Sequence, residues 1–448
     1  MQWRLSKLGP KILIGLFVLV VLGAGGYWYK FGYLDKKTEI TADQVVTYSQ
    51  VKEAAFIEEA YGVIADNFWQ AMSDEQLADL FFQSLSRVYG TQPELKEKNL
   101  AGLTQRIESL VKTQPDKNHS QLIAQTLDLV LQNLQPFGRS RLYSQSDETA
   151  LKNTVSNVDP ETDLFATLGI DETATSEAIT SAYDQKKEEI EQTVTDAQEK
   201  AQLLAQVDRA YQAVGDEASR ERYVETKVEP TIFGESLTPQ VYYIKIGKFS
   251  PTTVEDLDNI LKKMPRDNQY QSLVLDLRAN VGGAIDGLPY FLGPFIGQDQ
   301  YAYQFFSQGE TSDFKTVTGR IEEINNFKQI VVLIDGQTQS SAEVMAATLK
   351  KYGVGVLVGW TTKGWGTVER IFPLENQISS DTIYSVFLVH SLTLDENSQT
   401  IEGVGVKPDI DVTKKGWQTE LLGYFNNQQL VDAVGQLITS KPSNNGSE

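Results

Sequence analysis

The sequence contains no cysteine and only two histidines, and these absences exclude several kinds of chemistry. Without cysteine, the chain cannot form a disulfide, use a thiolate nucleophile or build a cysteine-based metal site. His119 and His390 are far apart in the sequence and lack the spacing of paired metal ligands. We therefore expect the protein to use no metal and no cofactor.

Basic residues are also scarce relative to acidic ones. The 448 residues include 60 Asp and Glu against 40 Lys and Arg, which gives a formal net charge of −20. A nucleic-acid-binding protein needs a basic face, and no cluster of Lys and Arg of that kind is present, so we expect no nucleic-acid partner. The length predicts two to four domains with ample material for a hydrophobic core.

One long apolar run is present, near the amino terminus. Residues 12–29 carry no charge, and at about 1.5 Å per residue they nearly cross a ~30 Å hydrocarbon layer. Arg4, Lys7 and Lys11 precede the run, and the aromatic residues 27–29 stand where an interfacial belt would lie. The pattern predicts a transmembrane signal-anchor, which makes a single-pass membrane protein with its body on the extracytoplasmic side. Cleavage of this segment as a signal peptide is the alternative.

Residues 42–145 have the periodicity of a helical N-terminal domain. Ser73 and Gln76 form a capping-box pattern, and apolar residues then recur at helical spacing up to Pro136. We see no chemistry in this domain.

A second helical unit is predicted over residues 160–228. The stretches "DLFATLGI", "ATSEAITSAY" and "VDRAYQAVGDEASRERY" occur in that order, and the unit resembles the J-domain of co-chaperones. In that family a His-Pro-Asp turn engages an ATP-dependent chaperone, but the aligned positions here hold Glu191, Gln192 and Thr193. We therefore expect no chaperone partner and interpret the unit as a structural or binding module.

The pattern changes to α/β over residues 239–412, followed by C-terminal helices over 413–440. Unbroken apolar runs predict strands buried on both faces of a parallel sheet, as in "VYYIKI", "SLVLDL", "QIVVLI" and "VGVLVG". The segments "TIYSVFLVHSLTL" and "TIEGVGVKPDIDV" predict further strands. Gly- or Ser-bearing loops follow three of the buried runs. Because sites in open α/β sheets form beyond the carboxyl ends of strands, these loops are expected to meet in one crevice.

Ser340 begins the segment "SSAEVMAATLKKYG" and admits two interpretations. With Glu343 three residues later, it fits a capping box and could serve only to satisfy free helix N–H groups. A serine at a strand-to-helix junction can equally be a nucleophile beside N–H groups that stabilise an oxyanion. Gly282 and Gly283 follow another buried strand and could bring a second donor close, since no Cβ intervenes.

The stretches "LVLDLRANVGG", "SSAEVMAATLKKYGVGVLVG", "GWGTV" and "IEGVGVKPDI" resemble, in order and spacing, the C-terminal processing, or tail-specific, serine peptidases. "LQPFGRSRLY" is similar to the stretch that ends the helical region of that family. The resemblance implies a mixed α/β core, a peptide-binding cleft, a Ser-Lys dyad and no metal. It implies Ser340 as the nucleophile. It places the oxyanion donors on the Gly282/Gly283 turn and the Ser341 amide.

The sequence departs from this family at the general base. The run "GWGTVE" places Trp365 at the family's lysine and Glu369 at the glutamine that orients it. An indole N–H is only a donor and cannot accept the serine proton, whereas the chemistry needs a neutral amine. Lys363 could substitute if the loop is extended, with Glu369 holding its amine, and His390 is a weaker substitute. Trp365 could also fill the vacated space or offer an aromatic wall to a peptide.

Three functions follow from these observations. The first is a membrane-anchored serine endopeptidase that cleaves extended or unfolded polypeptide tails outside the cytoplasm. The second is an inactive pseudopeptidase that binds extended peptides. The third is a scaffold whose helical parts dock a partner. The family usually carries a PDZ domain, for which the helical unit at 160–228 leaves too few residues.

Overall fold

The computed structural model describes residues 48–91, 97–266, 270–395 and 397–439. The chain divides into two compact units, residues 1–49 and 50–448, and all the elements below belong to the second.

No helix within these described ranges is long and apolar enough to cross a lipid bilayer. This finding contradicts the predicted location as a single-pass membrane protein with an extracytoplasmic body. The segment predicted to span the membrane, residues 12–29, itself lies outside the described residues.

Four helices form the N-terminal helical region, as the periodicity predicted. The capping box at the start of the second is present, because the Gln76 amide donates to the Ser73 hydroxyl and the Ser73 amide donates to the Gln76 side chain. The apolar faces of the helices share a core that includes side chains of the strand 384–394. The helices are α2 (Lys52–Asn67), α3 (Asp74–Tyr89), α4 (Leu100–Thr113) and α5 (His119–Gln132).

That strand belongs to an antiparallel sheet which carries the helical region on one face. The order is β1-β10-β5-β6, and β9 also pairs with β10. The sequence predicted only the long strand of this sheet, β10. Its members are β1 (Arg141–Ser144), β5 (Tyr301–Ser307), β6 (Glu310–Lys315), β9 (Thr367–Pro373) and β10 (Tyr384–Leu394).

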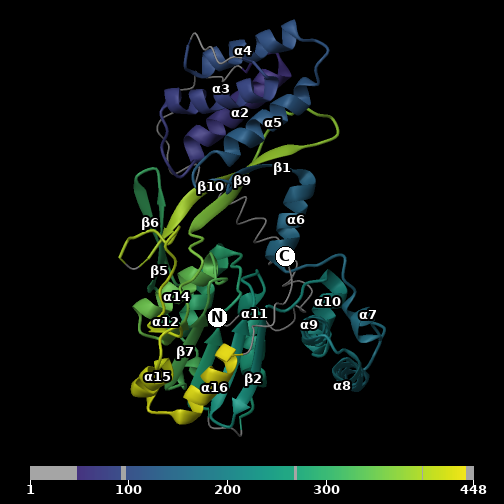
Figure 1. Cartoon of the computed structure of the whole chain (residues 1–448), viewed down its shortest axis with the longest axis vertical. Coiled ribbons are helices and arrows are strands. Elements are labelled where there is room, and N and C mark those ends of the chain that lie inside the picture. Colours follow the sequence, from purple (N-terminus) through teal and green to yellow (C-terminus); the bar gives the residue numbers. More distant parts are fainter. Residues whose placement is uncertain (1–47, 92–96, 267–269, 396, 440–448) are drawn as a thin grey trace, which may run out of the picture. The chain divides into compact units, whose positions relative to one another are not determined.

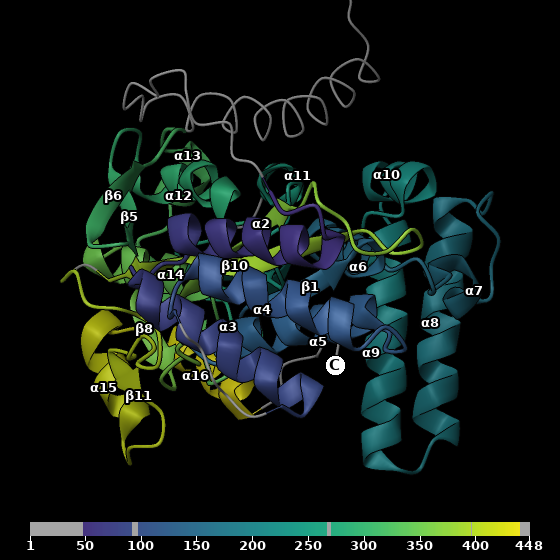
Figure 2. The ribbon, with the colours of Figure 1, turned by 90° about the horizontal axis from the view of Figure 1, so that it is seen from above.

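The unit predicted to resemble a J-domain is helical, and α8 and α9 lie side by side as a hairpin (Figure 2). Arg222 joins the unit to helix α11 through an ion pair with the buried Asp256, 2.7 Å long. The positions aligned with the His-Pro-Asp turn, 191–193, are the last residues of α8. The helices here are α6 (Gln145–Ser156), α7 (Leu164–Leu168), α8 (Ser176–Thr193), α9 (Ala197–Val214), α10 (Glu217–Thr226) and α11 (Thr253–Lys263).

The core is a six-stranded sheet of order β11-β8-β7-β4-β3-β2. All neighbours are parallel except β2, which is antiparallel to β3. The four strands predicted from unbroken apolar runs are confirmed as its centre. The strands are β2 (Ile232–Thr238), β3 (Val241–Ile246), β4 (Ser272–Asp276), β7 (Gln329–Ile334), β8 (Val356–Gly359) and β11 (Ile410–Asp411).

Helices cover both faces of this sheet, which is why its strands are apolar on both sides. Leu273 and Leu275 pack toward α12 and α14, whereas Val274 between them packs toward α15 and α16, the yellow helices of Figure 1. The mixed α/β fold class is confirmed in this respect. The remaining elements are η1 (Ile285–Gly287), α12 (Leu288–Ile296), α13 (Glu322–Asn325), α14 (Ser341–Lys351), α15 (Trp417–Phe425) and α16 (Gln428–Thr439).

Candidate functional site

The loops after β4, β7 and β8 meet at the carboxyl edge of the core sheet. The Thr338 hydroxyl after β7 donates to the Leu277 carbonyl after β4 over 2.9 Å. The Lys363 amide after β8 donates to the Thr338 carbonyl over 3.0 Å. These three strands are neighbours in the parallel sheet, so their carboxyl ends lie together. The predicted crevice therefore has its three loops in direct contact.

Ser340 has a strained backbone at the start of α14. Its φ and ψ are 56° and −127°, a conformation that costs a residue with a Cβ of the order of 1–3 kcal/mol. An ordinary N-cap serine of the same chain, Ser73, has φ −72° and ψ 156° in the extended region that caps prefer. A cap alone does not require this strain, so the backbone favours a functional position for Ser340.

The glycine turn after β4 lies directly against Ser340. A Cβ on Gly282 would lie 2.6 Å from the Ser340 Cβ and 3.1 Å from its Oγ, so only glycine leaves room for this serine. The Gly282 amide is already used, because it donates to the Asn280 side chain over 2.8 Å. Gly282 thus supplies space rather than an oxyanion donor.

The amide of Gly283 is directed differently. The Gly282 carbonyl and the Ala284 amide bond to Phe249 on one side, so the N–H between them faces the other side, toward the end of β7. Within the described residues, neither this N–H nor the Ser341 N–H has a hydrogen-bond partner. Two unoccupied donors therefore flank Ser340, as an oxyanion site requires.

The carboxylate of Glu343 fixes the loop after β8 relative to Ser340. One oxygen accepts from the Ser340 amide at 2.9 Å and from the Trp365 amide at 2.8 Å. The other accepts from the Gly364 amide at 2.7 Å and from the Thr362 hydroxyl. The side chain is fully buried, and burial raises the pKa of its carboxyl, although these four bonds lower it. The backbones at 340 and 365 are therefore held against the same oxygen atom.

Trp365 stands where the family resemblance places the lysine, and two cations lie close to its ring. The guanidinium carbon of Arg139 is 3.4 Å from the ring centroid, and the Lys363 Nζ is 5.2 Å from it. Arg139 also forms a 3.1 Å ion pair with Glu402, whose second oxygen accepts from the Gly366 amide. The Trp365 ring is thus braced by Arg139, which follows helix α5, and the Trp365 amide shares a Glu343 oxygen with the Ser340 amide.

Lys363 does not have the surroundings of a general base. Its side chain is exposed, whereas burial is what lowers a lysine pKa enough for it to accept a proton. The side chains of Lys363 and Trp365 do lie on the same side of the loop, as predicted. Glu369 does not hold the Lys363 amine among the described residues. It accepts instead from the Thr367 hydroxyl at 2.6 Å, and burial raises the pKa of its carboxyl.

His390 lies at a bulge of β10 and faces away from Trp365. The His390 ring stacks against Phe372, and the positive charge of Arg370 helps to lower the pKa of the imidazole. His390 therefore lies on the side of β9 that carries the even-numbered residues. Burial lowers the pKa of the imidazole to about 4. The other side of β9 carries Glu369, so this histidine is not joined to the site.

A buried lysine, which no sequence pattern singled out, supports the glycine turn. Lys245 at the end of β3 donates to the Arg278 carbonyl over 3.0 Å, and burial lowers its pKa. Asp276, fully buried, accepts from both the amide and the guanidinium of Arg278. Both backbone groups of Arg278 are therefore fixed by charged side chains just before the turn at Gly282.

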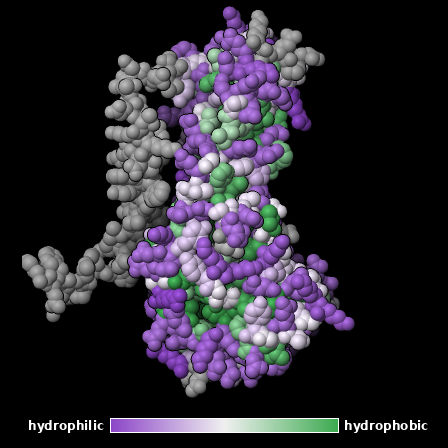
Figure 3. Space-filling view, turned by 90° about the vertical axis from the view of Figure 1, so that its left-hand side faces the viewer, coloured by the Kyte–Doolittle hydropathy of each residue, from purple (hydrophilic) through white to green (hydrophobic). Residues whose placement is uncertain are grey.

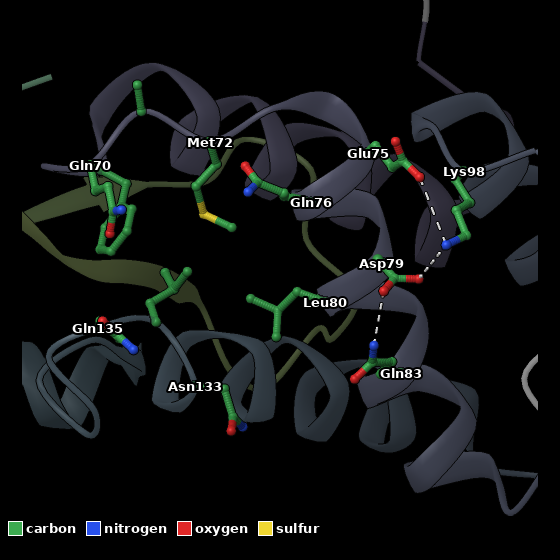
Figure 4. Close-up of a pocket in the computed structure, with 13 residues that line it drawn as sticks. Gln70, Met72, Glu75, Gln76, Asp79, Leu80, Gln83, Lys98, Asn133 and Gln135 are labelled. Atoms are coloured by element: carbon green, nitrogen blue, oxygen red, sulfur yellow. Dashed lines mark hydrogen bonds and ion pairs between the residues drawn. The ribbon is translucent and has the colours of Figure 1, made fainter.

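The helical region contains a groove of about 590 Å³ that is separate from these loops (Figure 4). Four of its polar side chains are engaged with one another. Lys98 lies 3.8 Å from Glu75 and 3.7 Å from Asp79, and the Gln83 amide donates to Asp79 over 2.9 Å. Met72 and the neighbouring apolar side chains form its floor. None of the candidate catalytic or oxyanion residues lines this groove, and we assign no chemistry to it.

Residues 240–412 match the sequence profile of Peptidase family S41. Over these residues the chain is similar to that family. The resemblance to C-terminal processing peptidases, read from the motifs, is thereby confirmed.

Curated proteins that are similar to part of this chain are named as carboxy-terminal-processing proteases or peptidases. A carboxy-terminal-processing protease of Bartonella bacilliformis is 27% identical over 207 residues, which are 42% of this chain and 45% of the relative. The chloroplastic carboxyl-terminal-processing peptidase 3 of Arabidopsis thaliana is 29% identical over 172 residues, which are 38% of this chain and 31% of the relative. The chain therefore spans less than half the length of the curated relatives it matches.

Solved structures that match part of this chain include a photosystem II D1 C-terminal processing protease. It is 13% identical with a TM-score of 0.46, and the match covers 81% of this chain and 93% of that one. A lipoprotein from Streptococcus agalactiae is 18% identical with a TM-score of 0.34, and that match covers 55% and 87% of the two chains.

Proposed function

We propose that the protein binds extended polypeptide segments at the carboxyl edge of its S41 domain and does not hydrolyse them. Similarity to a peptidase family implies polypeptide as the ligand. Figure 3 shows apolar surface at the level of the core domain, within a mostly hydrophilic surface. Beside the loops of the site, the exposed side chains of Val281 and Val404 suit the apolar side chains of a peptide whose backbone is bound by N–H donors.

The single observation that carries the proposal is the identity of residue 365. Acyl transfer by a serine needs a group that accepts the hydroxyl proton, and an indole N–H is only a donor. The Trp365 ring is held by Arg139 on one face, so it does not make room for another base. Ser340 and its flanking amides are then a binding site for a peptide carbonyl, without the step that would break the bond.

Hydrolysis with Lys363 as the base is the second candidate. Its support is the amide of Lys363, which bonds to Thr338 two residues before Ser340 and keeps the lysine at the rim of the site. The exposed position of the side chain argues against it.

One set of variants separates the two candidates. We would incubate the purified full chain and its variants Ser340→Ala, Lys363→Ala and Trp365→Lys with an unstructured fluorogenic peptide, and measure both cleavage and binding. The proposal expects binding without cleavage in the natural chain and cleavage gained in Trp365→Lys.

Trp360 is an exposed tryptophan of the same loop, and Trp360→Lys is the matched control that should gain no activity. Cleavage by the natural chain that disappears in both alanine variants would establish Lys363 as the base and contradict our proposal. Absence of any peptide binding would contradict both candidates.

The helical unit at 160–228 remains predicted to be a structural or binding module. Its ion pair between Arg222 and Asp256 supports a structural role, because Asp256 also accepts from the Thr231 amide just before the core sheet begins. A pull-down that keeps its partners after deletion of the unit would count against docking through it.

A further inference from the structure

We propose that one face of the antiparallel sheet, next to Trp365, is a docking surface for a proline-rich polypeptide segment. The inference rests on the proposed function and names the class of polypeptide that the protein binds. The surface consists of Tyr143, Ile371 and Phe387, which we call the aromatic face, and it is separate from the amides beside Ser340.

The register of the sheet places the three side chains of the aromatic face together. Phe387 in β10 pairs with Arg141 of β1 on one side and with Ile371 of β9 on the other. Tyr143 follows Arg141 by two residues and so lies on the same side of the sheet. The rings of Tyr143 and Phe387 stack with their centroids 4.5 Å apart and 4° between their planes. Val386, next to Phe387, is buried in the core shared with the helical region, so the aromatic face is turned away from those helices.

The aromatic face is not part of a hydrophobic core. Tyr143, Ile371 and Phe387 are all half-buried, and none of them belongs to a hydrophobic cluster formed by the described residues. The Tyr143 hydroxyl has no hydrogen-bond partner in the part of the chain that the structure describes. Aromatic rings with an available donor are what grooves that bind proline-rich segments present to their ligands.

The main chain beneath this face favours a ligand that needs no strand edge. Phe387 lies in β10, whose main chain is paired with β1 on one side and with β9 on the other. A peptide that lies across this face therefore meets side chains rather than the N–H and C=O groups of a strand edge. Proline carries no N–H, and a polyproline II segment leaves its carbonyls free. Such a segment can pack on the rings and accept from the Tyr143 hydroxyl without leaving a buried donor unpaired.

The aromatic face is continuous with the candidate site. Glu369 lies on the same side of β9 as Ile371, two residues earlier in the strand. Burial raises the pKa of the Glu369 carboxyl, and a hydrogen bond from the Trp365 side chain lowers it. Trp365 therefore connects the face to the loop that Glu343 holds against Ser340. One polypeptide can thus occupy the site and the aromatic face together.

Acidic groups beside the aromatic face favour a basic segment. Burial raises the pKa of the Tyr143 hydroxyl, and the carboxylates of Asp147 and Glu369 raise it further, so both carboxylates lie near the ring. Arg141 is a nearby cation, but it is already paired with Asp128 at 3.0 Å. Charge complementarity therefore favours a proline-rich segment that carries lysine or arginine over one that carries acidic residues.

The test compares two peptides that differ only in proline. A fluorescein-labelled peptide of proline, alanine and lysine is prepared together with a version in which serine replaces every proline, and their binding to the full chain is followed by fluorescence anisotropy. A polyproline II segment is already ordered and loses less conformational entropy when it binds. We therefore expect the proline peptide to bind about tenfold more tightly than the serine peptide. A proline peptide with glutamate in place of lysine should bind more weakly than the lysine form.

The variants Tyr143→Phe and Phe387→Thr locate the binding surface. Tyr143→Phe removes only the hydroxyl and should weaken the proline peptide roughly 2- to 10-fold, the range of one hydrogen bond. Phe387→Thr keeps a strand-forming residue but removes a ring, so it should also weaken the proline peptide while the serine peptide is unchanged. Tyr424→Phe is the matched control, because Tyr424 is 56% exposed on α15, and it should change neither peptide. Circular dichroism checks that each variant is folded, and Tyr143→Phe decides the location if Phe387→Thr is not.

The outcomes distinguish this inference from the proposed function. Equal binding of the proline and serine peptides, or tighter binding of the glutamate form, would overturn the inference and leave polypeptide binding intact. Unchanged binding in Tyr143→Phe, or equal weakening by Tyr143→Phe and Tyr424→Phe, would overturn the aromatic face as the docking surface. Failure of both the proline and the serine peptide to bind would reject the proposed function itself.

Discussion

Gly282→Ala tests whether the glycine turn and Ser340 are as close as the structure places them. The new methyl group would lie 2.6 Å from the Ser340 Cβ, 2.9 Å from the Gln339 carbonyl oxygen and 3.1 Å from the Ser340 Oγ. The backbone at Gly282 has φ +87°, where an L side chain costs roughly 1–2 kcal/mol. Overpacking of this kind adds typically about 1–3 kcal/mol. We expect a loss of about 2–5 kcal/mol in the free energy of unfolding.

This loss is a large share of the ~5–15 kcal/mol that stabilises a typical domain. Urea unfolding of the full chain, followed by circular dichroism, measures it as a lower midpoint. Gly287→Ala is the matched control, since Gly287 has φ −80° and a Cβ there meets nothing within 4 Å. It should stay within about 1 kcal/mol of the natural chain. If Gly282→Ala unfolds at the natural midpoint, or both variants lose the same stability, the described contact with Ser340 is wrong.

Three further substitutions probe the surroundings of the site. Glu369→Gln should raise the unfolding midpoint at pH 7 and lose this advantage near pH 4. Burial raises the pKa of this carboxyl above its ordinary 4.5, so the folded state binds the proton more tightly than the unfolded state does. The stability of the natural chain therefore falls as the pH rises through the folded pKa. Arg139→Ala should lower the free energy of unfolding by about 1–3 kcal/mol, because the contact with the Trp365 ring and the ion pair with Glu402 are lost. The control Arg141→Ala breaks an exposed ion pair and should lower it by under about 1 kcal/mol. Equal losses in the two variants would refute the bracing of Trp365. Lys245→Met should cost about 3–5 kcal/mol in urea unfolding because a buried ion pair is broken, and an unchanged midpoint would show that Lys245 does not support the turn.

The parallel core could be predicted from the sequence because its strands are buried on both faces. Such strands read as unbroken apolar runs, and the four predicted runs are β3, β4, β7 and β8. The strands β5, β6 and β9 of the antiparallel sheet mix polar and apolar residues without a clean period, so local patterning did not reveal them.

The segment "TIEGVGVKPDIDV" shows how glycine overrides an apparent strand. Only Ile410–Asp411 pairs as a strand, because Gly403 and Gly405 have φ values of 73° and 71°, which turn the chain. A Cβ on Gly405 would lie 2.5 Å from the Thr362 carbonyl, so this turn packs against the loop after β8. The two glycines are visible in the sequence, but the long-range contact with Thr362 that requires Gly405 could not be predicted from it.

The candidate site was predictable in its chain positions but not in its contacts. Ser340, the glycine turn and Trp365 are brought together as the spacing predicted. The contact of Arg139 with Trp365 joins residues more than two hundred positions apart, and no local pattern encodes such a pair. Likewise, a capping-box pattern identified Glu343 only as a helix signal, although it also holds the loop after β8.

The carboxylate of Glu343 accepts from the main-chain amides at positions 340, 364 and 365, and its fourth donor is the Thr362 hydroxyl. An amide N–H is present whatever side chain a non-proline residue bears. The side chain at position 365 can therefore change between a lysine base and another residue by the replacement of one codon, while the backbone of Ser340 keeps its place.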